Sequence, residues 1–384
     1  MRVLVAGGGI GGLAAAIACS RAGMEVEVME QASELGEVGT GLTLWPNGLL
    51  GLRRLGVELP DPERPIRRLR MSRAGGGDFA TVDVHGLEAR HGAGILAVPR
   101  ATLLAALRGM IPSGALRLGS QVTGYRPAGD RIELQVAGLD GSREAAGDML
   151  IGADGISSTV RGQLLGDAGP RPLGALAWRC IVDLPSGTIP PDEARQVWGR
   201  GGEFGWIPLL DGRTYWFCAE RLKAPEPRSA RDPAPSLIER FGSWAPEIAP
   251  IISASDESAI VRTELLARSV PRRWSRGPVA LLGDAAHGMA PNLGQGACQA
   301  LEDAVVLGRV LKSARHPAAA LREYSRARMP RAKAVSAVSA WTGALLYVDN
   351  GLLWRIRDAV FTATPSRALR LQLDRIVTSR ALRS

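Results

Sequence analysis

Lysine, histidine, cysteine and long apolar runs are all scarce in this chain of 384 residues. The four cysteines, Cys19, Cys180, Cys218 and Cys298, show no Cys-x-x-Cys spacing, so we expect reduced core residues and no disulfide or metal site. No apolar run reaches the roughly 18 residues that a membrane-spanning helix needs, and the first residues lack a signal-peptide pattern. We therefore expect a cytoplasmic protein without an integral membrane segment.

The net charge of +9 comes from arginine, because only three lysines occur. The basic residues are scattered, and no run of about five to eight of them forms the patch typical of nucleic-acid binding. We therefore expect no nucleic-acid partner. The hydrophobic fraction of 46% and the charged fraction of 22% are ordinary for a globular protein, and the length predicts about two to three domains.

Four short apolar segments read as strands of one sheet, although they lie far apart in the chain. They are residues 2–6, 25–30, 149–151 and 279–282. An Ala-rich helix at 13–21 separates the first two, so the chain opens with a strand–helix–strand unit. A further helix is expected at about 297–311. The pattern predicts a discontinuous nucleotide-binding domain.

The segment around residues 177–219 reads differently, as antiparallel strands rich in tryptophan. Asp211-Gly212 predicts a hairpin between the strands 203–210 and 214–219. Alternation places Phe204 and Trp206 on one face, which either lines a pocket or packs in a core. From Ala318 onward we expect helices, with breaks at Pro330 and Pro365.

The first chemical motif is Gly7-x-Gly9-x-x-Gly12, followed by Glu30 at the end of the second strand. Such glycines allow a tight turn and a close approach of backbone to pyrophosphate, and the helix N-terminus attracts the phosphates. The acid can bind a ribose hydroxyl. The motif predicts a dinucleotide, either FAD or NAD.

Two further motifs favour a flavin. Gly283-Asp284-Ala285-Ala286-His287 precedes Pro291-Asn292-Leu293-Gly294-Gln295-Gly296, which suits a polar clamp on a ribityl chain beside a flavin ring. Backbone N–H groups at the following helix could stabilise negative charge on the reduced flavin. The third motif is Asp154-Gly155-x-x-Ser158-x-Val160-Arg161.

In this order, the three motifs resemble those of the FAD-dependent class A aromatic monooxygenases, which have the p-hydroxybenzoate hydroxylase fold. The resemblance covers essentially the whole chain and implies an α/β fold: a Rossmann-like (GR2-type) FAD-binding domain, an inserted antiparallel β-sheet substrate domain and C-terminal helices. The implied boundaries are 1–70, 98–172 and 262–325 for the FAD-binding domain, 71–97 and 173–261 for the substrate domain, and 326–384 for the C-terminal helical region.

The resemblance also implies residue roles. The implied FAD contacts are Gly7, Gly9, Ile10, Gly11, Gly12, Glu30, Gln31, Arg100, Asp154, Arg161, Asp284, Pro291, Gly294, Gln295, Gly296 and Ala297. Pro291, Gly294 and Gly296 would form the flavin environment, and Phe204, Trp206 and Tyr215 the substrate pocket. His287 stands where the family often has a histidine without a chemical role, so we expect it to be structural.

Two positions depart from the family's pattern. Gln31 stands where many members place Arg or Lys, which puts an adenine contact in doubt. Glu203 stands where relatives acting on urate carry an arginine, which weakens a urate assignment. Tyr215 does match a tyrosine that reaches the substrate in such relatives.

The implied reaction is aromatic hydroxylation. NADPH or NADH reduces FAD, O2 adds at C4a, and the flavin C4a-hydroperoxide delivers one oxygen atom to an electron-rich phenol- or heterocycle-like substrate. Tyr215 is the one candidate for a substrate base. The pattern leaves open which nicotinamide cofactor is used and whether the protein is a monomer or a homodimer.

Other functions stay open at this point. The same cofactor chemistry serves epoxidation, Baeyer–Villiger oxidation or antibiotic modification, and a non-catalytic flavin-binding protein is a remote alternative. Gly205-Trp206-Ile207-Pro208 only partly resembles the flavin-halogenase motif, which disfavours that class. The absence of a Gly-x-Ser-x-Gly elbow argues against nucleophilic hydrolysis.

Overall fold

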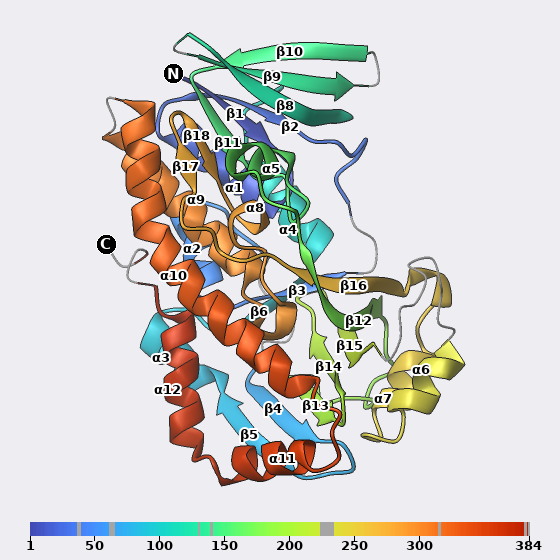
Figure 1. The fold of residues 1–384 in the computed structure, drawn as a ribbon. Helices are drawn as coiled ribbons and strands as arrows, with labels where there is room; N and C mark the ends of the chain where they lie inside the picture. Colours follow the sequence, from blue (N-terminus) through green and yellow to red (C-terminus); the bar gives the residue numbers. More distant parts are fainter. Residues whose placement is uncertain are drawn as a thin grey trace.

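The computed structural model describes residues 1–36, 40–60, 66–129, 131–138, 141–222, 234–313, 316–379 and 382. Figure 1 shows two large sheets at opposite ends of the molecule, joined by the long helix α10 (Pro317–Leu346). The predicted mixed α/β fold is confirmed. The domain boundaries given above remain a prediction.

The six-stranded sheet at one end gathers strands from across the chain. Its order is β17 (Ser275–Arg276), β18 (Val279–Leu281), β11 (Met149–Gly152), β1 (Arg2–Ala6), β2 (Glu25–Met29) and β7 (Leu116–Arg117). All neighbours run parallel except β17 and β18. The central strands are fully buried, which explains their continuous apolar sequence. The predicted return of three chain segments to one sheet is therefore confirmed.

Helices cover this sheet and bring its glycine-rich edges together. They include α1 (Ile10–Arg21), α5 (Thr159–Leu165), α8 (Asp284–His287) and α9 (Gly296–Lys312). Helix α1 packs on α9 through small residues, and a Cβ at Gly308 would lie 3.0 Å from that of Ala18. Helices α2 (Pro46–Leu55) and α4 (Arg100–Arg108) pack beside them. This contact places the N-termini of α1 and α9 at the same end of the sheet.

A three-stranded antiparallel sheet at one extremity was not predicted (Figure 1). It consists of β8 (Ser120–Ala128), β9 (Arg131–Gly138) and β10 (Gly141–Gly147). Strand β8 does alternate between buried and exposed positions, but Ser120 and Gly124 occupy two of the buried ones. Because these residues are not hydrophobic, the alternation is hidden in the sequence.

The seven-stranded sheet lies at the other end of the molecule. Its order is β16 (Val261–Ala267), β12 (Arg171–Val182), β15 (Thr214–Arg221), β14 (Gly202–Pro208), β13 (Glu193–Gly199), β4 (Arg68–Arg73) and β5 (Asp78–Asp83). Only β13 and β4 pair in parallel. The predicted hairpin at Asp211-Gly212 is confirmed, because it joins β14 to β15. Strands β3 (Gly41–Leu44) and β6 (Leu96–Pro99) form a separate pair between the two large sheets.

The two faces of the seven-stranded sheet have different surroundings. One face packs on α6 (Ala234–Phe241) and α7 (Ile248–Ser253) and buries an aromatic core. This core contains Trp178, Phe204, Trp206 and Trp216, all at most 1% exposed. The opposite face turns toward β3, α3 (Val84–His91), α12 (Ser366–Val377) and the end of α10.

The C-terminal region is helical, as predicted, but Pro330 does not break it. Helix α10 continues through this proline for 30 residues. A proline inside a helix costs one backbone hydrogen bond, and buried contacts on both sides of it, including Tyr324 and Val335, hold the helix. Pro365 does separate α11 (Leu353–Ala363) from α12. Among the described helices, none combines the length and apolarity needed to cross a bilayer.

All four cysteines are free and buried, as predicted. Within the described ranges, no cluster of His, Cys, Asp or Glu has a composition that could hold a metal ion.

Candidate active site

The glycine loop between β1 and α1 forms a cradle with one open side. Gly7 has a φ of +99°, and a Cβ there would overlap the Ala153 carbonyl oxygen; a Cβ at Gly12 would overlap the Gly7 carbonyl oxygen. A Cβ at Gly9, by contrast, meets no atom of the described residues within 4 Å. Gly7 and Gly12 are therefore glycines because protein backbone lies against them, whereas Gly9 faces free space.

The N-terminus of α1 points into this space without a side-chain cap. Gly9 is its N-cap residue, and the first turn holds no acidic residue. Ile10 and Gly11 belong to this first turn, so their backbone N–H groups share its direction. Unpaired N–H groups and the positive end of the helix dipole attract a phosphate group.

Glu30 lies at the end of β2 and braces the cradle. Its Oε2 accepts a hydrogen bond from Gly8 N at 2.5 Å, and its Oε1 accepts one from Ala32 N at 2.9 Å. A carboxylate has about four lone-pair sites, so capacity remains for a ribose hydroxyl. The neighbouring Gln31 is exposed.

Asp284 and the loop before α9 form the other side of the site. The carboxylate of Asp284 is exposed at the start of α8, and its Oδ1 lies 3.8 Å from the position of a Cβ on Gly296. The turn η2 (Pro291–Leu293) ends at Gly294, whose φ of +59° is left-handed. Gly296 and Ala297, both half-buried, then open α9. The structure brings these residues and the glycine cradle to one end of the six-stranded sheet.

The side chain of Gln295 points away from this loop into a buried polar network. Its Oε1 accepts a hydrogen bond from Asn47 Nδ2 at 3.0 Å. Asn47 also donates to Glu302, which pairs with Arg328 at 2.6 Å. The Oε1 atom of Gln295 is therefore held by the protein, and the network beneath it fixes the loop.

His287 belongs to the same network, in agreement with the structural role expected for it. Its Nε2 lies 2.6 Å from Asp303 Oδ2, and its ring lies 5.5 Å from that of Trp274. The side chain is fully buried. Asp303 also accepts a hydrogen bond from Arg328, so the histidine is part of the scaffold below α8.

The structure does not bring the Arg161 guanidinium to the cradle. It is 2% exposed, and it donates to Asp167, to the carbonyl oxygens of Ala285 and Ala286, and to that of Ser269. Every guanidinium nitrogen thus has a protein partner. Arg161 therefore holds the α8 segment that carries Asp284, and the direct cofactor contact expected from the motif stays a prediction.

Asp154 has a local role in its turn. Its Oδ1 accepts a hydrogen bond from Ser158 Oγ at 2.5 Å, and its Oδ2 accepts one from Val160 N at 3.0 Å. Burial raises the pKa of Asp154. Its Cα would lie 2.9 Å from a Cβ on Gly7, so the turn does abut the cradle. Arg100 opens α4, as predicted, and its backbone N donates to the Thr40 carbonyl oxygen.

These residues fit FAD. The free space beside Gly9 would be filled by a Cβ, as expected where a pyrophosphate approaches the backbone. Trp45 Nε1 is a buried donor that has no partner among the residues the structure describes, and it lies 3.2 Å from the position of a Cβ on Gly294. Asp284 is exposed, and in the sequence it lies between Gly9 and Gly294.

The face of the seven-stranded sheet that lies away from α6 and α7 carries a second group of side chains. We call it the polar face and define it by Arg179, Gln196, Glu203, Tyr215 and Phe217. Strand register places Arg179, Phe217, Gly205 and Gln196 in one row across four strands. A Cβ on Gly205 would lie 2.5 Å from the Phe217 ring, so that ring lies over the glycine.

Tyr215 lies on this face beside Phe217, with ring centroids 5.9 Å apart. Burial raises the pKa of Tyr215 to about 12. Its hydroxyl therefore stays protonated near neutral pH, which suits a hydrogen-bond donor and argues against the predicted role as a base.

Phe204 and Trp206 do not share this face with Tyr215. They point toward α6, where Phe204 stacks on Trp216 with centroids 5.4 Å apart. The alternation predicted from the sequence is present, but the aromatic side of β14 is the core side. The polar side of the same strand carries Glu203. In the sequence this residue is visible only as a single acid within an apolar run.

Glu203 links the polar face to the loop beside the cradle. It is 3% exposed, and it accepts hydrogen bonds from Gln196 and from Asn292 Nδ2, the latter at 3.1 Å. Tyr347, at the end of α10, donates at 3.4 Å. Burial raises the pKa of Glu203 to about 7. Sequence reasoning missed Asn292, Tyr347 and Arg179 because three distant segments supply them.

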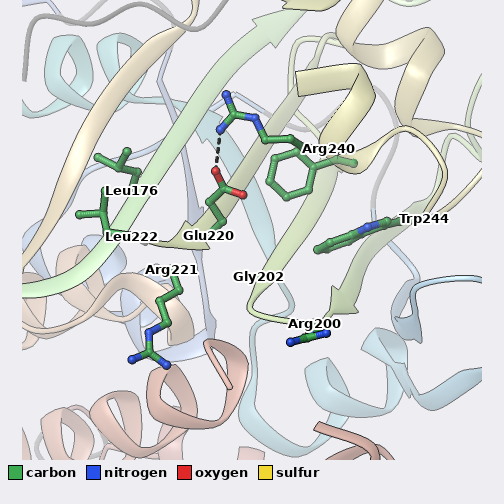
Figure 2. Close-up of a pocket in the computed structure, with 9 residues that line it drawn as sticks. Leu176, Arg200, Gly202, Glu220, Arg221, Leu222, Arg240 and Trp244 are labelled. Atoms are coloured by element: carbon green, nitrogen blue, oxygen red, sulfur yellow. Dashed lines mark hydrogen bonds and ion pairs between the residues drawn. The ribbon is translucent and has the colours of Figure 1, made fainter. Parts of the chain in front are cut away.

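A separate cavity of about 480 Å³ lies on the other side of the sheet (Figure 2). Leu176, Trp244 and Phe241 line it together with the ion pair of Arg240 and Glu220, at 2.5 Å. None of the predicted cofactor or substrate residues lies there.

Comparisons with known proteins agree with this geometry. Residues 1–339 match the family described as FAD binding domain. The chain is 37% identical over 361 residues to aurachin C monooxygenase/isomerase of Stigmatella aurantiaca, with 93% of each chain covered. It is 34% identical over 337 residues to the FAD-dependent urate hydroxylase of Klebsiella oxytoca, with 87% of each covered. The structure of Klebsiella pneumoniae HpxO with FAD and uric acid is similar at a TM-score of 0.90 and 30% identity, covering 98% of this chain and 96% of that one.

The fold and the cradle thus define an FAD-dependent aromatic hydroxylase with the p-hydroxybenzoate hydroxylase architecture. The chain belongs to the FAD-binding-domain family whose members include these monooxygenases.

Proposed function

We propose that this protein is an NAD(P)H-consuming monooxygenase that inserts one oxygen atom of O2 into a small aromatic or heteroaromatic molecule. The balanced reaction takes the substrate, O2, NAD(P)H and a proton to the hydroxylated product, water and NAD(P)+. One observation carries the proposal. The loop from Pro291 to Gly296 both borders the cofactor cradle and contacts the polar face through Asn292, so a substrate on that face would lie beside the flavin.

The chain's own residues would bind and orient both partners. Gly9 and the N-terminus of α1 leave room for the pyrophosphate, and Asp284 accepts hydrogen bonds from ribityl hydroxyls. The backbone N–H groups at Gly296 and Ala297 stabilise negative charge at the flavin pyrimidine. When bound, FAD accepts a hydride from NAD(P)H and activates O2 for transfer to the ring.

The polar face would hold the aromatic substrate. Phe217 and Tyr215 provide ring surface, and the protonated Tyr215 hydroxyl donates a hydrogen bond to a substrate oxygen. The side chains packed around them exclude water, which protects the activated oxygen from loss as hydrogen peroxide.

The test is a screen of phenols and hydroxylated N-heterocycles against the purified FAD-loaded protein. We expect substrate-stimulated oxidation of NADH or NADPH, and incorporation of one 18O atom from 18O2 into the product by mass spectrometry. NAD(P)H oxidation that yields only hydrogen peroxide with every compound, or FAD-loaded protein that oxidises no NAD(P)H, would contradict the proposal.

Gly9→Val and Gly23→Val form a matched pair for the cofactor side. A Cβ meets nothing within 4 Å at either glycine, but only Gly9 lies in the cradle. We expect folded but FAD-free protein for Gly9→Val. Because Gly23 has a φ of +83°, its variant is destabilised yet keeps FAD.

A further inference from the structure

Glu203 is a buried carboxylate, and no cation among the described residues pairs directly with it. Its three hydrogen-bond donors, Gln196, Asn292 and Tyr347, are all neutral. Arg179 lowers the pKa of Glu203 only through a longer-range charge interaction, and its guanidinium donates a hydrogen bond to Thr263 Oγ1 at 3.2 Å.

Two other deeply buried acids of the chain, by contrast, pair directly with a cation. Glu302 and Asp303 are fully buried, and each pairs with Arg328 at 2.6 Å. Burying a charge costs much less when a cation pairs with it directly. A glutamine at position 203 would keep one acceptor oxygen for Asn292 and Tyr347, and its NH2 group would donate to the Gln196 amide once that amide is turned round. Three hydrogen bonds could thus form without burying a charge, so the bonds to the fold do not explain the acid.

The carboxylate also has unused capacity. Two oxygens offer about four lone-pair sites, and the protein donors occupy three. Gln196 ends the row in which Phe217 covers Gly205, and Glu203 lies in the next row of the same face, so this capacity borders the aromatic surface of the polar face.

We propose that Glu203 determines substrate class by accepting a hydrogen bond from an N–H or O–H group of an uncharged heteroaromatic or phenolic ring, and by rejecting rings that carry a carboxylate there. This proposal rests on the proposed function, because it takes the polar face as the substrate site. A charged acceptor strengthens the bond to a donor and repels an anion in the same position.

Three related ring compounds separate these effects. 2-Pyridone offers an N–H donor and no charge, N-methyl-2-pyridone lacks the donor, and 6-hydroxynicotinate adds a carboxylate to the same ring. Dissociation constants are measured by calorimetry on the FAD-loaded protein without NAD(P)H, at about pH 8.5, where a group of pKa about 7 is ionised.

For the wild type, we expect 2-pyridone to bind at least about tenfold more tightly than either other compound, because each of them loses the donor or meets like charge. Glu203→Gln keeps an acceptor and removes the charge. It should therefore reduce the ratio of the dissociation constants of 6-hydroxynicotinate and 2-pyridone by about tenfold. Glu203→Arg should reverse that preference.

Glu193→Gln is the matched control. Glu193 is a buried acid of the same sheet, 6% exposed, but it lies on β13 against Arg68 and Arg70. Its variant should keep the wild-type order of affinities. Tyr347→Phe removes a hydrogen bond to Glu203 without changing charge, and should keep the order as well.

Unchanged affinity ratios in Glu203→Gln would overturn the proposal and leave Glu203 as a structural link, and so would failure of all three compounds to bind the wild type. If Glu203→Arg does not fold, the glutamine variant still decides. The proposed function fails separately, when no compound of the larger screen is oxygenated, since the affinity ratios are measured without turnover.

Discussion

The two faces of the seven-stranded sheet are made by the same strands but carry opposite kinds of side chain. The face toward α6 and α7 has a buried aromatic core that includes Trp178, Trp206 and Trp216. On the polar face, Arg179 and Glu203 lie on either side of Phe217. One face stabilises the sheet and the other is available for chemistry, so neighbouring residues on one strand should respond differently to substitution.

The largest effect is expected from adjacent residues of β15. Trp216 is fully buried, stacks on Phe204 and donates to Ser255 Oγ at 2.8 Å. Trp216→Ala should lower the free energy of unfolding by about 3–5 kcal/mol. Phe217 lies on the polar face and is half-buried, so Phe217→Ala should lower the stability less than Trp216→Ala does and should weaken substrate binding more. Urea unfolding and ligand titration of both variants check the contrast, and equal losses of stability would break it.

The pH dependence of stability should reveal the buried acid of the polar face. Burial raises the pKa of Glu203 from 4.5 to about 7, so the folded state holds the proton more tightly than the unfolded state. Stability is therefore greatest below pH 4.5 for this group and falls as the pH rises through about 7, by about 3 kcal/mol in total.

Glu203→Gln should remove that component, while Glu193→Gln should keep it. The measurement is the difference in unfolding free energy between each variant and the wild type at pH values from 4.5 to 8. A Glu203→Gln curve parallel to the wild-type curve would show that the group ionises without cost.

The next comparison concerns Asp284, which lies on the cofactor side of the loop from Pro291 to Gly296. Asp284→Ala removes a charge-assisted partner of the flavin's hydroxyl groups, worth about 1.5–3 kcal/mol, which corresponds to roughly 10- to 100-fold weaker FAD binding. Because the side chain is exposed, the stability of the FAD-free protein should change little. Fluorescence titration of FAD into both proteins tests this, and unchanged affinity would place the ribityl chain elsewhere.

The smallest structural effect is expected from Tyr215→Phe, which removes only a hydroxyl. Since the pKa of Tyr215 is about 12, its loss should leave the pH dependence of kcat/KM unchanged between pH 6 and 9 while lowering kcat/KM by about tenfold. A pH limb that disappears in this variant would restore the tyrosine as a base.

The cradle could be predicted from the sequence because its determinants are local. Gly7, Gly12 and Glu30 occupy a single strand–turn–helix–strand unit, where steric exclusion of a Cβ leaves only glycine. The polar face could not be predicted in the same way. Alternation shows that Phe204 and Glu203 point in opposite directions, but not which direction faces the cofactor, since α6 and α7 settle that from outside the strand.

The role of Arg161 shows the same limit at closer range. Its motif indicated the right region, yet the guanidinium turns inward because carbonyl groups of α8 and Asp167 surround it. Glu203 stood out in the sequence only as a departure from a pattern. Its partners Asn292 and Tyr347 lie about 90 and 140 residues further along the chain, beyond any local signal.

Helix α10 has a mechanical consequence for the whole molecule. Its 30 residues span about 45 Å, from contacts with β17 and β18 to the seven-stranded sheet (Figure 1), where the following Tyr347 donates a hydrogen bond to Glu203. Such a rod couples the two ends, so the sheet can tilt against the FAD-binding half only if the rod moves with it or bends. Pro330, where one backbone hydrogen bond is missing, is the point of lowest bending stiffness. The helix is therefore a strut between the two sheets whose hydrogen-bond ladder is interrupted at one point, and the buried contacts on both sides of that point keep it straight through the proline.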